Sequence, residues 1–392
     1  MSLSFEALIG EDLVNHTKLT ISNGENVTFY VDKKKGAEEL DRFTTNSNGS
    51  IIYMDTIKTI NLGHNEEDHN FIRNTFEKLD EIIDLDFVEM SNNNGSMIDI
   101  YHISYSSHFR ANVIGQALSQ KNTAGEWWDV FWKDSPLTGA INVNSNKNTI
   151  IHELGHVLGL RHPFNDPSNK NYDSEDTIMS YNMGYNGWDT WFSKADLNAL
   201  KKIWGRENDN GFITLEENSR FYKYKKASEK QYLIQTEIGY EVISNLKNLK
   251  FKDRILNVQN DIIDVFDLMT GVNEIPSQIY RLYNAAFGRF PDKTGLDYWI
   301  QKNKSMEEDI RNTAYNFIIS NEFTSHYGID MNNDEFLDKL YENILGRDPD
   351  INGYNYWLNQ LSSGIENRHE ILIGFSESSE NIEIFSMETS IF

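Results

Sequence analysis

The stretch His152-Glu-Leu-Gly-His156-Val-Leu-Gly159-Leu-Arg-His162 places three histidines, one acid and one glycine at fixed spacings. Residues four apart share one face of a helix, so His152 and His156 can direct ring nitrogens to one ion. Glu153 then lies one step around the helix, beside that ion. Gly159 allows the chain to leave the helix with a positive φ, and the resulting turn returns His162 as a third ligand. Three neutral imidazoles with an open fourth position are typical of catalytic rather than structural zinc.

These side chains together predict a hydrolytic centre that uses one Zn²⁺ ion. Three imidazoles around zinc allow a bound water to reach a pKa of about 7, so that hydroxide forms near neutral pH. Glu153 can accept the proton of that water and pass it to a leaving amine. The predicted reaction is therefore the hydrolysis of a peptide bond. The alternative is that the histidines are ordinary helix-surface residues without an ion.

Length and composition limit the classes of protein to which the chain can belong. Its 392 residues are too many for one compact core and predict two or three domains. A net charge of −24 opposes binding to nucleic acid or to an anionic membrane. The absence of cysteine excludes disulfides and thiolate metal sites. No apolar run is long enough to predict a membrane span.

Residues 1–208 carry alternating strand and helix patterns and are predicted to form one catalytic domain. Apolar residues at helical spacing, from Ile72 to Ile83, predict a helix that begins near Glu66. The helix that carries the histidines is predicted to begin near Asn148, and a closing helix to run from Ala195 to Trp204. Strands are predicted at residues 19–22, 27–31, 87–89, 98–101 and 140–144, with a turn at Asn23-Gly24 between the first two.

The rest of the chain divides into a β-rich linker module, 209–270, and a helical domain, 271–392. The helical domain contains an internal repeat, because Gly288-Arg289-Phe-Pro-Asp292 returns as Gly346-Arg347-Asp-Pro-Asp350, 58 residues later. Two such units are expected to pack together and bury Trp299 and Trp357. The predicted fold class is therefore α+β, with a catalytic domain, a small β-rich segment and an α-helical repeat domain.

The histidine stretch resembles the metzincin zinc metallopeptidases, and a second match lies in Asp176-Thr-Ile-Met179-Ser180-Tyr181, similar to the Met-turn of that family. Met-Ser-Tyr, and the His162-Pro163 pair, narrow the resemblance to the serralysin branch. The resemblance covers about residues 10–208. It implies that Met179 forms an apolar floor under the metal. It also implies that Tyr181 is a fourth metal ligand that moves away and then donates to the oxyanion.

The same resemblance implies a five-stranded twisted mixed sheet with the active-site helix at its base. Substrate would then lie in a cleft as an additional strand along an edge of the sheet. The candidate for this edge strand is Gly115-Gln-Ala-Leu-Ser119.

The chain also departs from the serralysin pattern. The glycine-rich calcium repeats that normally follow the catalytic domain are absent, so Ca²⁺ is not supported. Asp348-Pro-Asp350-Ile-Asn-Gly353 opens like an EF-hand loop, but its twelfth position is Asn359, and a capped turn is favoured. The helical repeat itself resembles a domain of unknown function found in secreted and surface-layer bacterial proteins.

Two further groups of side chains are candidate sites. His64, His69, His102 and His108 could form a second metal site with Asp99, although isolated loop histidines are usually solvated. The tryptophans 127, 128 and 132 could line the cleft or, equally, pin a long loop.

These observations predict a secreted zinc endopeptidase that acts on protein or peptide substrates. The N-terminus lacks a signal peptide, but the end Glu388-Thr-Ser-Ile-Phe392 resembles the uncleaved C-terminal signal of type I secretion, which predicts an extracellular protein. One alternative is a cell-surface or glycan-binding attachment protein that uses residues 271–392, with an accessory or self-processing protease. Another is a zinc hydrolase that acts on bonds other than peptides.

Overall fold

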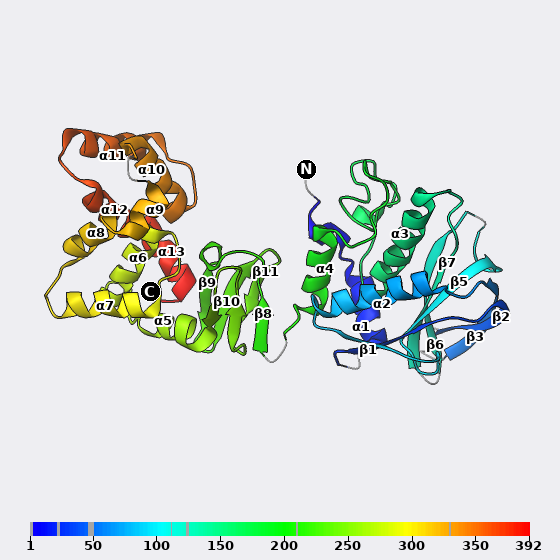
Figure 1. The fold of residues 1–392 in the computed structure, drawn as a ribbon. Coiled ribbons are helices and arrows are strands. Elements are labelled where there is room, and N and C mark those ends of the chain that lie inside the picture. Colours follow the sequence, from blue (N-terminus) through cyan, green and yellow to red (C-terminus); the bar gives the residue numbers. More distant parts are fainter. Residues whose placement is uncertain are drawn as a thin grey trace. The chain divides into compact units, whose positions relative to one another are not determined.

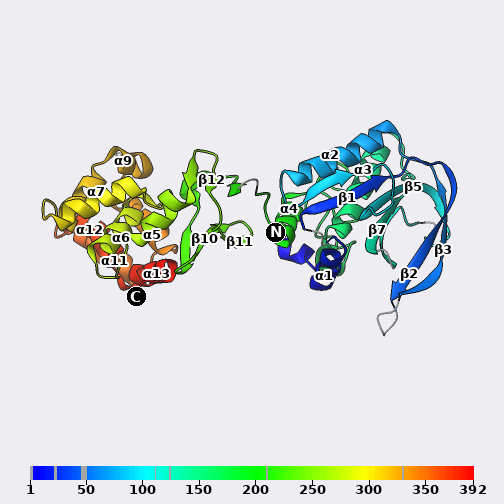
Figure 2. The same ribbon diagram turned by 90° about the horizontal axis from the view of Figure 1, so that it is seen from below.

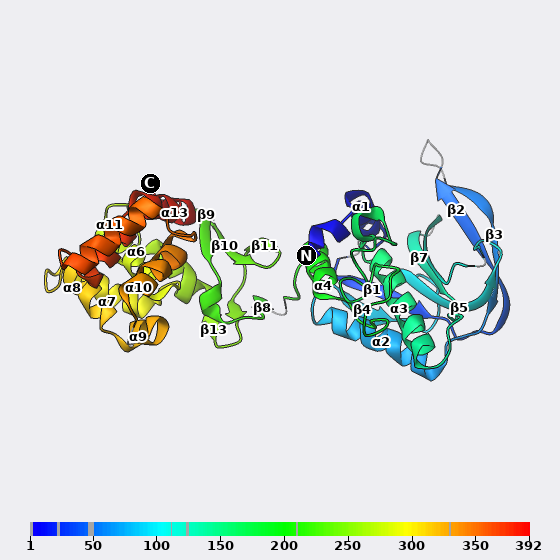
Figure 3. The same cartoon turned by 90° about the horizontal axis from the view of Figure 1, so that it is seen from above.

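A computed structural model describes residues 3–21, 24–45, 51–110, 112–122, 125–208, 211–328 and 331–392. The chain divides into two compact units, residues 1–207 and 208–392. Figures 1, 2 and 3 show the elements of each unit from three directions. None of the helices in the described ranges has the length and apolar character needed to cross a membrane.

The N-terminal unit is built on a mixed sheet. Five strands lie in the order β4-β1-β5-β7-β6, parallel except for β6, which runs antiparallel to β7. A long antiparallel hairpin, β2-β3, extends the sheet to seven strands by pairing with the end of β5. The predicted five-stranded mixed sheet therefore has two more strands than expected. The strands are β1 (Asn26–Val31), β2 (Gly36–Thr45), β3 (Ile51–Asn61), β4 (Asp86–Glu89), β5 (Ile98–Ser106), β6 (Gly115–Asn122) and β7 (Gly125–Trp132).

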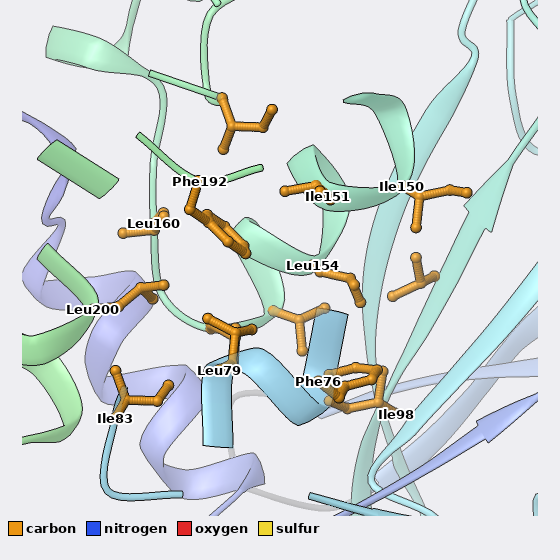
Figure 4. Close-up of a cluster of buried hydrophobic side chains, with 14 of the residues drawn as sticks. Phe76, Leu79, Ile83, Ile98, Ile150, Ile151, Leu154, Leu160, Phe192 and Leu200 are labelled. Carbon is orange, nitrogen blue, oxygen red and sulfur yellow. The ribbon is translucent and has the colours of Figure 1, made fainter. Parts of the chain in front are cut away.

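Helices cover one face of this sheet and pack apolar side chains against it. In α2 (Glu66–Asp80), the side chain of Asn65 caps the first turn and Ile72, Phe76 and Leu79 are buried, as the spacing predicts. Side chains of α2, α3 (Ala140–Val157) and β5 meet in one hydrophobic cluster (Figure 4). The remaining helices of the unit are η1 (Phe5–Leu8), α1 (Glu11–Thr20), η2 (Pro163–Asn165) and α4 (Lys194–Trp204).

Two strands predicted in this unit are helical instead. Leu19 and Thr20 belong to α1, while Ser22 and Asn23 lie outside the described residues. Residues 140–144 form the first turns of α3, which begins eight residues earlier than predicted, after Gly139 with φ 70°. The alternation that predicted this strand comes from Ile141 and Val143, and both are exposed, so no sheet buries them.

The C-terminal unit begins with small sheets and continues into helices. Strands β11-β10-β9 form one three-stranded sheet and β13-β12-β8 another. One hydrophobic cluster joins these sheets to the helices, since it contains Ile213, Val265, Leu296 and Phe385. The elements before the repeats are β8 (Phe212–Thr214), η4 (Ser219–Phe221), β9 (Tyr224–Ser228), β10 (Gln231–Thr236), β11 (Gly239–Val242), β12 (Asn248–Lys250), β13 (Ile255–Asn257), η5 (Val258–Ile263) and α5 (Asp264–Asp267).

The helical part contains two equivalent sets of helices, offset by the 58 residues of the sequence repeat. The first set is α6 (Ile275–Phe287), α7 (Lys293–Lys304), α8 (Ile310–Ile318) and α9 (Asn321–Tyr327). The second set is α10 (Asn333–Leu340) with η6 (Tyr341–Leu345), α11 (Ile351–Ser363), α12 (Arg368–Ser376) and α13 (Ser379–Thr389).

The repeat extends to individual contacts. The guanidinium of Arg289 binds Glu322 with Nε–Oε1 at 2.6 Å, and Arg347 binds Glu380 in the same way at 2.7 Å. At the turns, the Asp350 carboxylate accepts a hydrogen bond from the Gly353 backbone N–H at 2.9 Å, so the predicted capped turn is confirmed. The repeat tryptophans, Trp299 and Trp357, are half-buried rather than buried.

Candidate metal centre

The three histidines of the opening stretch come from the end of α3 and the turn that follows it. His152 and His156 lie one helical turn apart on α3, and His152 is buried. Helix α3 ends at Val157, and Gly159 has the predicted positive φ, 97°. The chain then reverses and brings His162, directly before η2, back to the other two. Gly159 thus acts as predicted.

The ring nitrogens of the three histidines converge. One nitrogen from each lies within 4.8 Å of the others, and this is the one group of three or more metal-ligating side chains among the described residues. The Nε2 atoms of His152 and His162 are 3.2 Å apart. Two nitrogens that bind one tetrahedral zinc ion at about 2.0–2.1 Å are separated by about 3.3 Å. The donor set and its spacing therefore fit a zinc ion.

Backbone carbonyls fix the orientation of two of these rings. His152 Nδ1 donates to the Ile178 carbonyl at 2.9 Å, and His156 Nδ1 donates to the Leu160 carbonyl at 2.8 Å. Each Nδ1 carries the proton, so each Nε2 presents a lone pair to the centre. Burial also lowers the pKa of all three, that of His162 to about 4, which keeps the imidazoles neutral as metal binding requires.

Glu153 lies beside this centre between α3 and the edge strand β6. Its carboxylate is buried, and burial raises its pKa to about 8 although it accepts a hydrogen bond from the Ala117 backbone N–H. A Cβ atom at Gly115 would lie 2.5 Å from Glu153 Oε1, so only glycine leaves room for this carboxylate. Strand β6 therefore both encloses and holds the acid.

The predicted Met-turn lies directly against the histidine helix. Met179 is buried, and a Cβ at Gly155 would lie 2.6 Å from Met179 Sδ. Tyr181 follows with its ring centroid 5.2 Å from that of His152 and 5.1 Å from that of His162. Burial, with the nearby charge of Glu153, raises the pKa of Tyr181, so its phenol stays protonated as a hydrogen-bond donor. The structure thus brings the predicted site residues to one place.

Asp196, on α4, supports the centre although no motif pointed to it. Its buried carboxylate accepts hydrogen bonds from Thr177 Oγ1 at 2.5 Å and from the Ile178 backbone N–H at 2.9 Å. It also closes a capping box with Ser193 at the start of α4. The sequence could show Ser193 and Asp196 as a capping pair, but the contact of Asp196 with the Met-turn depends on the tertiary structure.

The N-terminal segment braces the turn that leads to the third histidine. The Arg161 backbone N–H donates to the Leu8 carbonyl at 2.9 Å, and Ile9 pairs with Leu160 as an antiparallel bridge. These contacts hold the chain immediately before His162. Sequence reasoning missed them, because they join residues about 150 positions apart.

A cavity of about 390 Å³ opens beside the centre. The ionisable residues of its lining are His152, Glu153 and Tyr181. The predicted edge-strand candidate, residues 115–119, is in β6, which ends the five-strand order, and Gly115 lines the cavity. The remaining lining residues are Asn112, Val113, Ile114, Ser145, Asn148, Thr149, Ser180 and Trp188.

The other groups considered from the sequence do not contribute to this centre. Trp128 and Trp132 belong to the core of the unit rather than to the cavity. His64 accepts a hydrogen bond from Trp132 Nε1 at 2.9 Å, and His69 pairs with Glu89 at 2.6 Å. Within the described residues these histidines do not form a second cluster of metal ligands.

Residues 314–385 match the model of a family described as a domain of unknown function, DUF4214. The match runs from α8 to α13 and agrees with the resemblance noted for the helical repeat. No curated protein matches the chain.

Proposed function

We propose that the N-terminal unit is a zinc-dependent endopeptidase of the metzincin type, similar to serralysins. The observation that carries the proposal is the convergence of His152, His156 and His162 within 4.8 Å, with Glu153 beside them. A site with three imidazoles, a neighbouring carboxylate and an adjoining cleft has the donor set of catalytic rather than structural zinc.

Within this proposal each side chain has a chemical task. A bound zinc ion supplies Lewis acidity, which makes water acidic enough to act as a nucleophile near neutral pH. Glu153 accepts the proton of the attacking water and passes it to the amine that leaves. The Ala117 N–H holds the carboxylate in place for both transfers. Because burial strengthens proton binding, Glu153 is suited to act as an acid as well as a base.

Tyr181 has the task of stabilising the negative charge that develops on the carbonyl oxygen. Its ring lies next to two of the histidines, and its raised pKa keeps the O–H available as a donor. A donor that is strongest where charge develops lowers the barrier rather than only binding the substrate. By the family resemblance, the same phenol would be a further ligand of the metal before substrate binds.

We further propose that substrate binds as an extended polypeptide along β6. This strand ends the five-strand order of the sheet beside the cavity, so its outer edge can pair with a peptide through main-chain hydrogen bonds. Glu153 is the one carboxylate among the lining residues, and the lining contains no lysine or arginine, which favours uncharged side chains near the scissile bond.

The decisive experiment compares Glu153→Gln with a control, Glu67→Gln, which changes an exposed glutamate paired with Lys147. We expect Glu153→Gln to keep one zinc per chain, measured by atomic emission, and to lose casein cleavage. The control should keep both properties. Cleavage of casein by Glu153→Gln at the wild-type rate would contradict the mechanism, and absence of zinc in the wild type would contradict the site.

The proposal includes export from the cell. Detection of the chain in the culture medium of the cells that make it would support export, and confinement of the chain to the cells would contradict it.

A further inference from the structure

The two helical repeats are equivalent in their internal contacts, so a difference in what surrounds them is informative. Helix α7 in the first repeat corresponds to α11 in the second. Each begins after a capped Gly-Arg-x-Pro-Asp turn, and the tryptophan of each lies against a phenylalanine. The ring centroids are 5.3 Å apart for Trp299 and Phe317, and 5.5 Å apart for Trp357 and Phe375.

In the first repeat, another segment of the chain covers one side of α7. Leu296 and Ile300 of α7 are buried in one cluster with Ile262, Val265 and Phe266, which come from η5 and α5. Lys293 of α7 lies 4.0 Å from the acidic Asp264 of this covering segment. The cover is thus a short amphipathic helical segment, apolar on its inner side and acidic at its rim.

In the second repeat, the equivalent side of α11 is only half-covered. Tyr354 and Leu358 occupy the positions of Leu296 and Ile300, and both are half-buried. Among the described residues of α11, none is buried. Figure 1 shows α11 at the outer edge of the helical part of the unit, whereas α7 runs beside α5.

The apolar residues of α11 have the spacing of a helix interface. Ile351, Tyr354, Leu358 and Leu361 fall at intervals of three and four residues along one stripe of the helix, and Ile351 is 75% exposed. Ile365, which is 67% exposed, follows in the turn after Gly364, where the helix has ended. We call this stripe the α11 face. We define it by Ile351, Tyr354, Leu358 and Leu361 of α11, together with Ile365 of the turn that follows the helix.

The charges around the α11 face are those of an interface that would accept a basic partner. Residues 351–365 contain no charged residue, whereas the equivalent stretch 293–307 contains Lys293, Asp297, Lys302, Lys304 and Glu307. Depletion of charge at the centre is typical of protein interfaces. Beside Tyr354 lie two aspartates of α10, Asp334 and Asp338, and the Tyr354 hydroxyl donates to Asp334 Oδ1 at 3.0 Å.

We propose that the α11 face is the docking site for an amphipathic helical segment of another polypeptide, apolar on one side and basic at its rim. The first repeat is the basis for this proposal, because there the corresponding face of α7 is buried against such a segment, formed by η5 and α5. The charges are reversed, since α7 offers Lys293 to an acidic cover, whereas α11 is flanked by aspartates. A second copy of this chain fits less well, because two acidic rims would meet.

The test uses two peptides derived from the internal cover. The first is residues 257–270, and the second carries the changes Asp261→Lys, Asp264→Lys and Asp267→Lys. Binding of each labelled peptide to the full chain is measured by fluorescence anisotropy. We expect the lysine peptide to bind at least about tenfold more tightly than the aspartate peptide, because its charge complements Asp334 and Asp338.

Variants of the chain then locate the binding site. The double change Ile351→Asn and Ile365→Asn alters two mostly exposed residues and should weaken the lysine peptide at least about tenfold. Ile351→Lys introduces the residue found at the equivalent position of the first repeat, Lys293, and should weaken binding of the lysine peptide by charge repulsion. Tyr356→Ala is the matched control, because Tyr356 is 52% exposed, lies off the stripe and packs edge-on against Trp357, and should leave binding unchanged.

Two results would overturn the proposal. One is the absence of binding by the lysine peptide, or equal binding by the wild type and the double variant, while circular dichroism shows both folded. The other is a dimer in analytical ultracentrifugation that Ile351→Asn with Ile365→Asn abolishes, since the face would then be occupied by a second copy.

Discussion

The carboxylate of Asp196 accepts a hydrogen bond from the backbone N–H of Ile178 at 2.9 Å, and the carbonyl of the same Ile178 accepts one from His152 Nδ1 at 2.9 Å. One peptide segment therefore connects a buried acid on α4 with the ring of His152, a candidate metal ligand on α3. The acid does not line the cavity, but it fixes the segment that orients the ring.

Replacing Asp196 by alanine is expected to weaken zinc binding about 10- to 100-fold, the usual cost of losing an outer partner of a metal ligand. The Thr177 hydroxyl and two backbone N–H groups lose their acceptor, so the free energy of unfolding should also fall by about 1–3 kcal/mol or more. Zinc affinity is measured by competition with a chromophoric chelator. Asp196→Asn, which keeps one acceptor oxygen, should recover part of the affinity, and equal zinc affinity in all three proteins would contradict this role.

Gly115→Ala is expected to reduce kcat while leaving zinc affinity unchanged. The new methyl group would lie 2.5 Å from Glu153 Oε1 and 2.7 Å from Thr149 Cγ2, so the carboxylate has to move from its position. A displaced general base typically costs about 10²-fold or more in rate. Peptide cleavage and zinc content are measured together. Gly271→Ala, in the C-terminal unit, is the control, and an unchanged kcat for Gly115→Ala would argue against Glu153 as the base.

Tyr181→Phe is expected to lower kcat by about 10²-fold, because it removes one donor to the developing oxyanion. Zinc should remain bound, since the three histidines are unchanged. Tyr185→Phe provides a control at a fully exposed tyrosine of the same loop region. Steady-state kinetics on a fluorogenic peptide separates kcat from KM. An effect on KM alone would assign Tyr181 to substrate binding instead.

The stability of the chain is expected to depend on pH through Asp99. This carboxyl is buried beside Asp129, Asp32 and Glu38, and burial raises its pKa to about 8. The folded state therefore holds a proton that the unfolded chain has already lost above about pH 4. Below about pH 4, Asp99 is protonated in both states and does not lower the free energy of unfolding. Above that pH, the free energy of unfolding falls by about 1 kcal/mol per pH unit until the pH passes about 8.

Asp99→Asn removes this dependence, so its advantage over the wild type should grow between about pH 5 and pH 8. Urea unfolding at several pH values measures the difference. Asp55→Asn is the control, and its pH dependence should have the opposite sign. Arg42 lowers the pKa of Asp55, so the ion pair stabilises the wild type above the acid range, and the variant should be less stable there. A constant difference between Asp99→Asn and wild type across this range would show that Asp99 is ionised in the fold.

The site could be predicted where its residues are close in sequence. The spacing of His152, His156 and His162 depends on helical periodicity and one glycine turn, and both are local properties. Ile178 and Asp196 escaped prediction because their role depends on contacts between segments 26 and 18 residues apart. The sequence could show that Ser193 and Asp196 cap a helix, but not what else the acid would bind.

The fold, like the site, could be predicted where it depends on local sequence patterns. In α2, three buried residues at helical spacing agree with the pattern, because one side of that helix faces the sheet. At residues 19–22, β-branched residues favoured a strand, but tertiary packing places Thr17 and Thr20 in the buried side of α1. The repeat predicted equivalent turns, yet not that Tyr354 and Leu358 would be only half-buried where Leu296 and Ile300 are buried, because the cover of α7 lies outside the repeated sequence.

The hydrogen bond from the Arg161 backbone N–H to the Leu8 carbonyl has a consequence for the order of events during synthesis. The turn before the third histidine is held by residues 8 and 9, while the Met-turn is held by Asp196, which is made about 190 residues later. A ribosome adds about 5–20 residues per second in a growing cell, so many seconds separate the two. A nascent chain that ends before Asp196 consequently lacks the contact that fixes the Ile178 segment, so the proposed endopeptidase is expected to become active only after Asp196 has been made.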